Sequence, residues 1–203
     1  FETDVKPILR DGLRKAILQC DDNELKRIDK SDADQILRER LRIISQNVDE
    51  DAEMDLDSFL EYCRIAVVRD GCKMIVLDPW NEIEHKRRRD EQETEYIGRA
   101  LRQIKRFSRQ YDVAFWIVAH PTKPHEGSSK IPGLYDISGS ANWANKPEYG
   151  LTYHRPDPQK NEAQIRTTKV RMGLPGEKKT VDVEYDFRNS QFKLAPKKQG
   201  AQT

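Results

Sequence analysis

The sequence has little cysteine and no long apolar run, and both absences exclude classes of protein. Its three cysteines form no CxxC pair, which argues against a zinc site or a disulfide framework and favours a reducing compartment. No stretch approaches the roughly 18 apolar residues that a membrane-spanning helix needs, and no signal peptide opens the chain. The formal net charge is only +1, so any binding to nucleic acid must come from local clusters of charge.

Length and composition favour one domain with a thin core. Of the 203 residues, 36% are hydrophobic and 35% are charged, which is more charge than a typical globular domain carries. The chain starts at Phe1 without a methionine, so we expect it to be a piece of a longer protein. We expect residues 1–195 to form the domain and residues 196–203 to be a disordered tail.

The first two thirds of the chain alternate between two hydrophobic patterns. Apolar residues at helical spacing predict helices, and short continuous apolar runs predict strands. The expected helices cover residues 5–18, 34–40, 59–67 and 97–108. The expected strands cover residues 41–44, 74–77 and 113–119. This αβαβαβ order is typical of a parallel sheet that is covered on both faces.

After residue 120 the composition changes. Residues 121–147 are rich in Pro, Gly, Ser, Lys and Asn, and a loop of this length inside a compact domain is usually functional or disordered. Residues 149–154, 163–171 and 180–194 then alternate between apolar and polar, which predicts antiparallel strands. A hairpin turn is expected at Arg188-Asn189-Ser190.

Two apolar runs end in polar residues that can carry chemistry. Met74–Leu77 runs into Asp78, and Val113–Ala119 runs into His120. In an open parallel sheet, ligands bind just past the carboxyl ends of the strands, and a carboxylate there suits a Mg²⁺-bound phosphate. The alternatives are an Asp that starts a turn before Pro79 and a His that is capped at a strand end.

Further along, Lys169 and Arg171 lie two residues apart, so they share one side of a strand. They are either functional cations or part of a solvated, charged edge.

Taken in order, several segments resemble one family. The matching segments are Phe1-Glu2-Thr3, Ile75–Asp78, Val118–Lys123, Gly139–Glu148, His154-Arg155 and Lys169–Gly176. Together they resemble the RecA-like ATPase domain of DnaB-type hexameric replicative helicases, a group that includes the phage primase-helicases. The resemblance covers about residues 1–194. It implies an α/β fold: a RecA-like three-layer core with a mostly parallel sheet and a C-terminal antiparallel extension.

The resemblance assigns roles within one subunit. Asp78 would hold Mg²⁺ in the Walker B position, and Glu2 would orient or deprotonate the attacking water, with Glu82 as a weaker alternative base. His120 would sense the γ-phosphate of ATP. Asn145 lines up with an amide linked to the same sensing, where the family commonly has Gln.

The resemblance also assigns roles between subunits and on DNA. Arg171 would be an arginine finger that reaches the nucleotide of a neighbouring subunit in a hexameric ring, with Lys169 beside it and Arg155 at the same interface. Single-stranded DNA would meet cations in the loops after the two strands. These candidates are Lys123 and Lys130 after His120, and Arg87 and Arg88 in the run Lys86–Arg89. The alternative for that run is a solvated helix start, because three nearby glutamates partly cancel its charge.

One family motif is absent from the sequence. No segment fits the phosphate-binding loop GxxxxGK[ST], and the nearest stretch, Gly127–Lys130, lacks the first glycine. The simplest interpretation is that the chain begins after this loop and that the N-terminal strand is missing with it. Without the loop we expect weak ATP binding and little hydrolysis.

The leading interpretation is therefore the motor domain of a replicative DNA helicase, working with ATP and Mg²⁺ in the bacterial or phage-infected cytoplasm, with no membrane partner. One alternative of the same fold is a RecA-like recombination or regulatory ATPase. A second is a metal-dependent phosphohydrolase that uses Asp78, His120 and either His85 or His125. A third is a non-catalytic interaction module.

Overall fold

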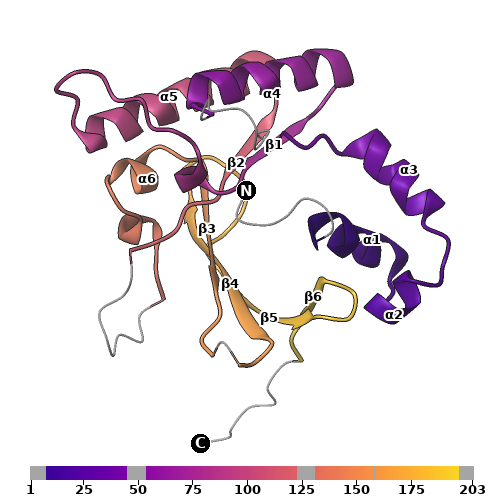
Figure 1. Ribbon diagram of the computed structural model, residues 1–203. Coiled ribbons are helices and arrows are strands. Elements are labelled where there is room, and N and C mark those ends of the chain that lie inside the picture. Colours follow the sequence, from indigo (N-terminus) through magenta and orange to yellow (C-terminus); the bar gives the residue numbers. More distant parts are fainter. Residues whose placement is uncertain (1–7, 45–53, 123–130, 158, 197–203) are drawn as a thin grey trace, which may run out of the picture. The chain divides into compact units, whose positions relative to one another are not determined.

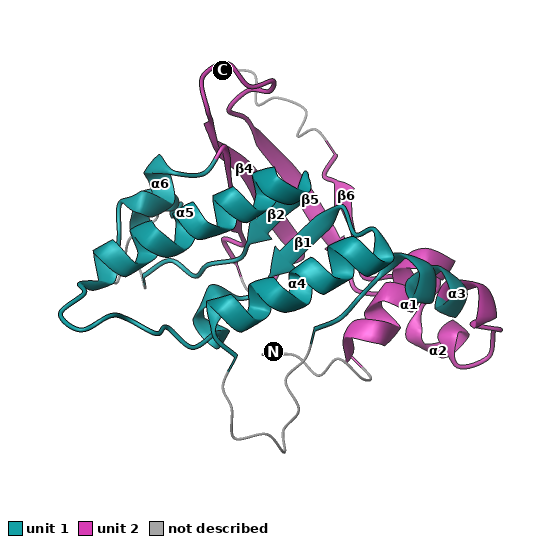
Figure 2. Cartoon of the chain, turned by 90° about the horizontal axis from the view of Figure 1, so that it is seen from above, with its two compact units in different colours: residues 1–5, 34–147 teal, residues 6–33, 148–203 magenta. Residues whose placement is uncertain are grey.

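The computed structural model describes residues 8–44, 54–122, 131–157 and 159–196 (Figure 1). These residues form two compact units, which Figure 2 distinguishes by colour. The first unit is built from residues 34–147, and the second from residues 8–33 and 148–196. Each unit has its own sheet, parallel in the first and antiparallel in the second. The chain is thus a mixed α/β fold.

A two-stranded parallel sheet and two long helices make up most of the first unit. β1 (Met74–Leu77) pairs with β2 (Ala114–Ile117). α4 (Leu56–Asp70) precedes β1, and α5 (Glu93–Tyr111) connects the strands, as parallel neighbours require. Both helices lie on the same face of the sheet (Figures 1 and 2). These four elements confirm the predictions made from hydrophobic periodicity.

Side chains and backbone geometry set where the helices begin and end. The Asp55 carboxylate accepts a hydrogen bond from the Ser58 amide at 2.8 Å and starts α4. Gly71, in the left-handed conformation with φ of 69°, ends it. The Glu95 carboxylate accepts from the Gln92 amide at 3.3 Å at the start of α5. These caps explain why the helices stop short of the strands.

The core of the first unit lies between the helices and one face of the sheet. Ile75 and Leu77 of β1 are buried there. They belong to one cluster with residues of both helices: Phe59, Leu60, Cys63, Ile97, Ala100, Leu101, Ile104 and Phe107. Burial of this apolar surface is the main source of stability for such a layer.

The opposite face of the parallel sheet is exposed. Met74 and Val76 of β1 are 61% and 49% accessible, and Trp116 of β2 is 45% accessible. The apolar runs therefore predicted the strands correctly, but the expectation of a sheet covered on both faces is wrong for the described residues. The period-two alternation decides this, because every second side chain faces away from α4 and α5.

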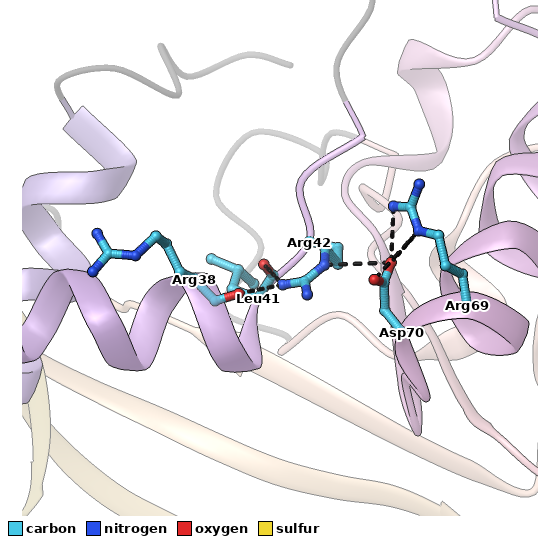
Figure 3. Close-up of polar contacts among 5 residues, drawn as sticks. All are labelled: Arg38, Leu41, Arg42, Arg69 and Asp70. Atoms are coloured by element: carbon cyan, nitrogen blue, oxygen red, sulfur yellow. Dashed lines mark hydrogen bonds and ion pairs between the residues drawn. The ribbon is translucent and has the colours of Figure 1, made fainter.

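The expected strand at residues 41–44 is also wrong. α3 (Ser31–Arg40), which spans the boundary of the two units, runs directly into this segment, and no strand forms there. Instead Arg42 caps the helix end: its Nη1 donates to the carbonyls of Arg38 and Leu41, and its Nε lies 3.4 Å from the Asp70 carboxylate (Figure 3). Asp70 is also bound by Arg69 at 3.0 Å. An apolar run needs a paired neighbour to become a strand, and here a side-chain clasp occupies that stretch.

The second unit is built on a four-stranded antiparallel sheet. Its strands are adjacent in chain order: β3 (Tyr149–His154), β4 (Glu162–Val170), β5 (Thr180–Asp186) and β6 (Gln191–Leu194). The turn between β5 and β6 lies where the sequence predicted it, and Ser190 has a φ of 58° there. Two helices precede this sheet in the chain: α1 (Arg10–Leu18) and α2 (Asp22–Leu25). The Gln191 amide donates to the Ala16 carbonyl at 3.0 Å, which joins α1 to β6.

Three short helical segments follow the parallel strands in the first unit. They are η2 (Trp80–Glu82), η3 (Leu134–Asp136) and α6 (Asn142–Asn145). None was predicted, because three or four residues carry less than a full period of apolar spacing. Within the described part of the chain, no helix is both long and apolar enough to cross a membrane.

Candidate functional site

Asp78 and His120 follow the two parallel strands at the same edge of the sheet. The Val118 amide donates to the Leu77 carbonyl at 2.9 Å, and the Trp80 amide donates to the Val118 carbonyl at 2.8 Å. Pro79 has no amide hydrogen, so Trp80 supplies the bond that would otherwise come from position 79. These two bonds place Asp78 opposite Val118, with His120 two residues further along.

The two side chains belong to the exposed face of the sheet. Exposure alternates along β1 and continues to Asp78, and it alternates along β2 and continues through Val118 to His120. Both polar residues therefore lie on the face that α4 and α5 leave open. An Asp and a His at neighbouring strand ends, on one accessible face, is the arrangement in which parallel α/β sheets bind ligands.

A small hollow of about 60 Å³ lies beside Asp78. Glu82 contributes the second carboxylate of its lining, and the remaining lining is mostly apolar: Ile44, Met54, Phe59, Val76, Leu77, Pro79 and Ile83. One or two carboxylates suit Mg²⁺, which keeps several waters and takes its remaining ligands from phosphates. The donor set fits a Mg²⁺-bound phosphate better than a metal held by protein alone.

The described residues hold no group of three or more His, Cys, Asp or Glu side chains that could bind a metal ion. His85 belongs to a different environment: its Nδ1 lies 3.1 Å from the Tyr96 hydroxyl, and its ring stacks on Trp80 at 4.7 Å. Burial lowers the pKa of His85, which favours the neutral ring. His125, the other candidate for a metal-dependent phosphohydrolase, lies outside the described residues.

The segment after β2 is closed into a loop. Pro121 forms a bridge with Ile137, and both the amide and the hydroxyl of Thr122 donate to the Asp136 carbonyl, at 2.8 and 2.9 Å. The loop that carries Lys123 and Lys130 therefore starts and ends at a fixed base beside His120. Lys123, Lys130 and Glu2 themselves lie outside the described residues.

An aromatic cluster links the segments that follow the two strands. The Trp143 ring meets the Trp80 ring edge-on at 5.2 Å, and Trp143 Nε1 donates to the Ser138 carbonyl at 3.1 Å. Trp80 follows β1, whereas Trp143 lies in α6, beyond the loop after β2. Sequence reasoning missed this cluster, because its members are far apart in the chain. The one available signal was the position of Trp80, two residues after Asp78.

The basic run after β1 has two parts with different environments. Lys86 binds the Asp55 carboxylate at 2.8 Å and Glu84 at 3.2 Å, and these contacts raise the pKa of Lys86. Arg87 and Arg88 are exposed. Lys86 therefore fixes the run to the start of α4, and the two arginines that follow it face solvent.

Asn145 ends α6, and α6 is fastened to α5. The Thr94 hydroxyl donates to the Gly139 carbonyl at 2.7 Å, and Asn142 Nδ2 donates to the Thr94 carbonyl at 3.2 Å. Asn145 is itself exposed. It lies in the same unit as Asp78 and His120, in the chain segment that follows the loop after β2.

The predicted cations of the second unit lie at the end of β4. Gly150 pairs with Lys169 whereas Leu151 pairs with Thr167, so β4 bulges at residue 168. Bulges of this kind redirect the side chains that follow them. Arg171 lies just past the strand and is half-buried, and its amide donates to the Glu148 carbonyl at 2.8 Å.

Arg155, the third predicted cation of this unit, contacts its own hairpin. Its Nε donates to the Lys160 carbonyl at 2.7 Å, and its guanidinium lies 5.9 Å from the centre of the Phe187 ring. Arg155 thus has a structural role on the second sheet, whatever it does at an interface between subunits.

Comparisons with known proteins give one match by sequence and one by structure. The chain is 36% identical over 152 residues to the Twinkle homolog protein, chloroplastic/mitochondrial, of Arabidopsis thaliana. This match covers 71% of the chain but only 21% of the plant protein, so the chain spans about a fifth of that relative. The fold matches the ATPase domain of a phage helicase with a TM-score of 0.70 at 15% identity, covering 96% of this chain and 72% of that one. No family model matches the chain.

Proposed function

The chain carries the RecA-like ATPase domain of the DnaB-type helicases, and we propose that this domain couples ATP hydrolysis to movement along single-stranded DNA. The observation that carries the proposal is the position of Asp78 and His120 at neighbouring strand ends on one exposed face. An inert shell of this fold has no reason to present an acid and an imidazole together at the edge where such sheets bind ligands.

In this proposal each residue acts on a nucleotide bound at that edge. Asp78 holds Mg²⁺ directly or through water, with Glu82 nearby in the same hollow. Mg²⁺, when bound, neutralises charge on the β- and γ-phosphates. A neutral His120 donates one ring N–H to a γ-phosphate oxygen. Glu2, assigned by resemblance alone, accepts a proton from the attacking water.

The cations of the second unit complete the site from a neighbouring subunit. Arg171 follows a bulged strand end, and we propose that it reaches the nucleotide of the next subunit in a ring, with Lys169 beside it. Charge that develops on the transferred phosphoryl group needs such a cation. Asn145 and Arg155 contribute to γ-phosphate sensing and to the interface, respectively.

DNA contact falls to the loops at the same edge. Arg87 and Arg88 are exposed after β1, and the loop after β2 starts at a fixed base between Thr122 and Asp136. The Trp80–Trp143 contact joins the two segments. A shift of Asp78 or His120 on hydrolysis would therefore move both loops together. Lys123 and Lys130 remain predicted contacts. The cytoplasmic location also remains a prediction, and the plant relative is named as a chloroplastic/mitochondrial protein.

The test is DNA-stimulated ATP hydrolysis and strand separation on a forked duplex by the full-length protein. Asp78→Asn is expected to abolish both, because a neutral amide binds Mg²⁺ weakly. Asp112→Asn is the matched control, since Asp112 precedes β2 at the opposite edge of the sheet and adopts a left-handed conformation that Asn tolerates. Hydrolysis without strand separation would point instead to a recombination or regulatory ATPase. Hydrolysis that survives Asp78→Asn would contradict the assigned site.

A further inference from the structure

The helix α5 carries a charge unlike the rest of the chain. Between Tyr96 and Tyr111 it has five cationic side chains and no carboxylate, although the whole chain has a net charge of only +1. Its acidic residues, Glu93 and Glu95, are confined to the first turn. The positive charge of the chain is therefore concentrated along this helix.

Four of the cations form a stripe on the outer face of α5. Arg99, Arg102, Arg106 and Arg109 are spaced three, four and three residues apart, which places them on one side of a helix. The opposite side of α5 packs into the core through Ile97, Leu101 and Ile104, among others. Arg102, Arg106 and Arg109 are exposed. The stripe thus faces solvent along about three turns.

Most of the stripe is not neutralised by neighbouring carboxylates. In the described part of the chain, Arg102, Arg106 and Arg109 form no ion pair and no side-chain hydrogen bond, whereas Arg99 pairs with Glu91 at 2.8 Å. On α4, across a groove from Arg106, the Glu61 carboxylate is held by Arg64 at 2.6 Å. Asp57 in the same groove accepts from Gln103.

A hollow of about 400 Å³ connects the stripe to the loop after β1. Arg88, Arg99 and Arg102 line it together with the amide of Asn142. Gly98 keeps the hollow open, because a Cβ there would lie 2.9 Å from Asn142 Nδ2. The hollow also contains Glu91 and Glu95, but Arg99 pairs with the first, and the second accepts a backbone hydrogen bond at the start of α5.

We propose that the outer face of α5, entered at the hollow beside Arg88, is a second surface for the phosphate backbone of nucleic acid. Successive arginines lie about 5–6 Å apart along the helix, a spacing that lets each one meet a different phosphate. No aromatic side chain belongs to the stripe, so the contact is with the backbone and is independent of base sequence.

This surface goes beyond the function proposed above. A helix between two parallel strands runs back from their carboxyl edge, so the stripe leads away from Asp78 and His120. A strand bound at the edge loops continues along α5 rather than ending at Arg87 and Arg88. The contact needs neither a nucleotide nor hydrolysis.

The test measures binding of fluorescein-labelled oligo(dT) to the full chain without nucleotide, across a salt titration. Arg102→Gln, Arg106→Gln and Arg109→Gln are combined in one variant. Each phosphate contact adds about 0.7 to the slope of log affinity against log salt for a single strand, so the slope should become shallower by about 2. A variant with Lys at all three positions should bind like the parent, because the contact is one of charge.

The matched control removes three exposed cations elsewhere by combining Lys26→Gln, Arg27→Gln and Lys178→Gln. It has the same net charge as the α5 variant and should keep the parent slope, and thermal melts of all variants check the fold. An unchanged slope in the α5 variant overturns the proposal, as does a loss that the control shares. Loss of binding to poly-glutamate with oligo(dT) binding intact would instead make α5 a surface for an acidic protein. Because no hydrolysis is measured, these outcomes are independent of the role of Asp78.

Discussion

Trp80 and Val118 are joined by a backbone hydrogen bond of 2.8 Å from the amide of one to the carbonyl of the other. The bond holds the residue after Asp78-Pro79 against the end of β2, two residues before His120. The same Trp80 packs its indole ring against His85 and Trp143. One residue thus aligns the two polar strand ends and ties them to the segments that follow.

The two tryptophans at positions 143 and 116 should differ in their effect on stability. Trp143 is 4% accessible and packs on Trp80, whereas Trp116 is 45% accessible on the open sheet face. Trp143→Ala is expected to lower the free energy of unfolding by about 3–5 kcal/mol, the usual cost of a large buried aromatic. Trp116→Ala should cost clearly less. Urea unfolding compares them, and equal losses would mean that the sheet face is covered in solution.

Asp55 should make stability depend on pH. The Lys86 ammonium and the Ser58 amide hold the pKa of Asp55 at about 2, below its ordinary value of 3.8. A depressed carboxyl pKa adds stability that is present above the ordinary value and is lost as the pH falls through the folded one. Asp55→Asn should therefore be less stable than wild type at neutral pH, and the difference should shrink toward pH 2. A pH-independent difference in chemical unfolding would contradict the ion pair.

Gly139 should be the less replaceable of two glycines with similar backbone. Gly139 and Gly173 have φ of 86° and 85°, but a Cβ on Gly139 would lie 2.7 Å from both Glu93 Oε1 and Ile97 Cδ1, whereas Gly173 has open space. Gly173→Ala should cost about 1–2 kcal/mol from the left-handed conformation alone. Gly139→Ala should cost more, because the loop before α6 must also move off α5. Similar melting temperatures for the two variants would remove the clash from the account.

Arg171 should act on rate rather than on affinity. In the full-length protein, Arg171→Ala is expected to lower ATP hydrolysis by about 10³–10⁵-fold, the usual effect of an arginine finger, while nucleotide binding stays largely intact. Arg166→Ala on the same strand is the control, since that side chain is exposed within β4. Parallel losses of affinity and rate in Arg171→Ala would place the residue in its own subunit's site.

Sequence patterns predicted the elements that obey a long period. α4, α5 and the strands β1 to β6 follow from apolar spacing that continues over the length of each element. Residues 41–44 look like a strand by composition alone, but a strand exists only where a neighbour pairs with it, and Arg42 instead caps α3 and contacts Asp70. The short helix α6 carries too few residues for a period to be visible.

The candidate site divides in the same way. Asp78 and His120 could be found because each follows an apolar run directly, and parallel connection brings such ends to one edge. The pairs Asp55–Lys86 and Glu91–Arg99 could not be found, because a carboxylate in a charged stretch gives no signal of which cation it contacts. The aromatic cluster around Trp80 depends on His85, Tyr96 and Trp143, which only the folded chain brings together.

The most direct test of the account is a double-mutant cycle on DNA-stimulated ATP hydrolysis by the full-length protein, with Asp78→Asn, His120→Ala and the pair combined. Residues that act on one nucleotide lose activity as a unit, so the double variant should be about as slow as the slower single variant. Losses that multiply, or full activity in either single variant, would show that the two strand ends do not serve one site.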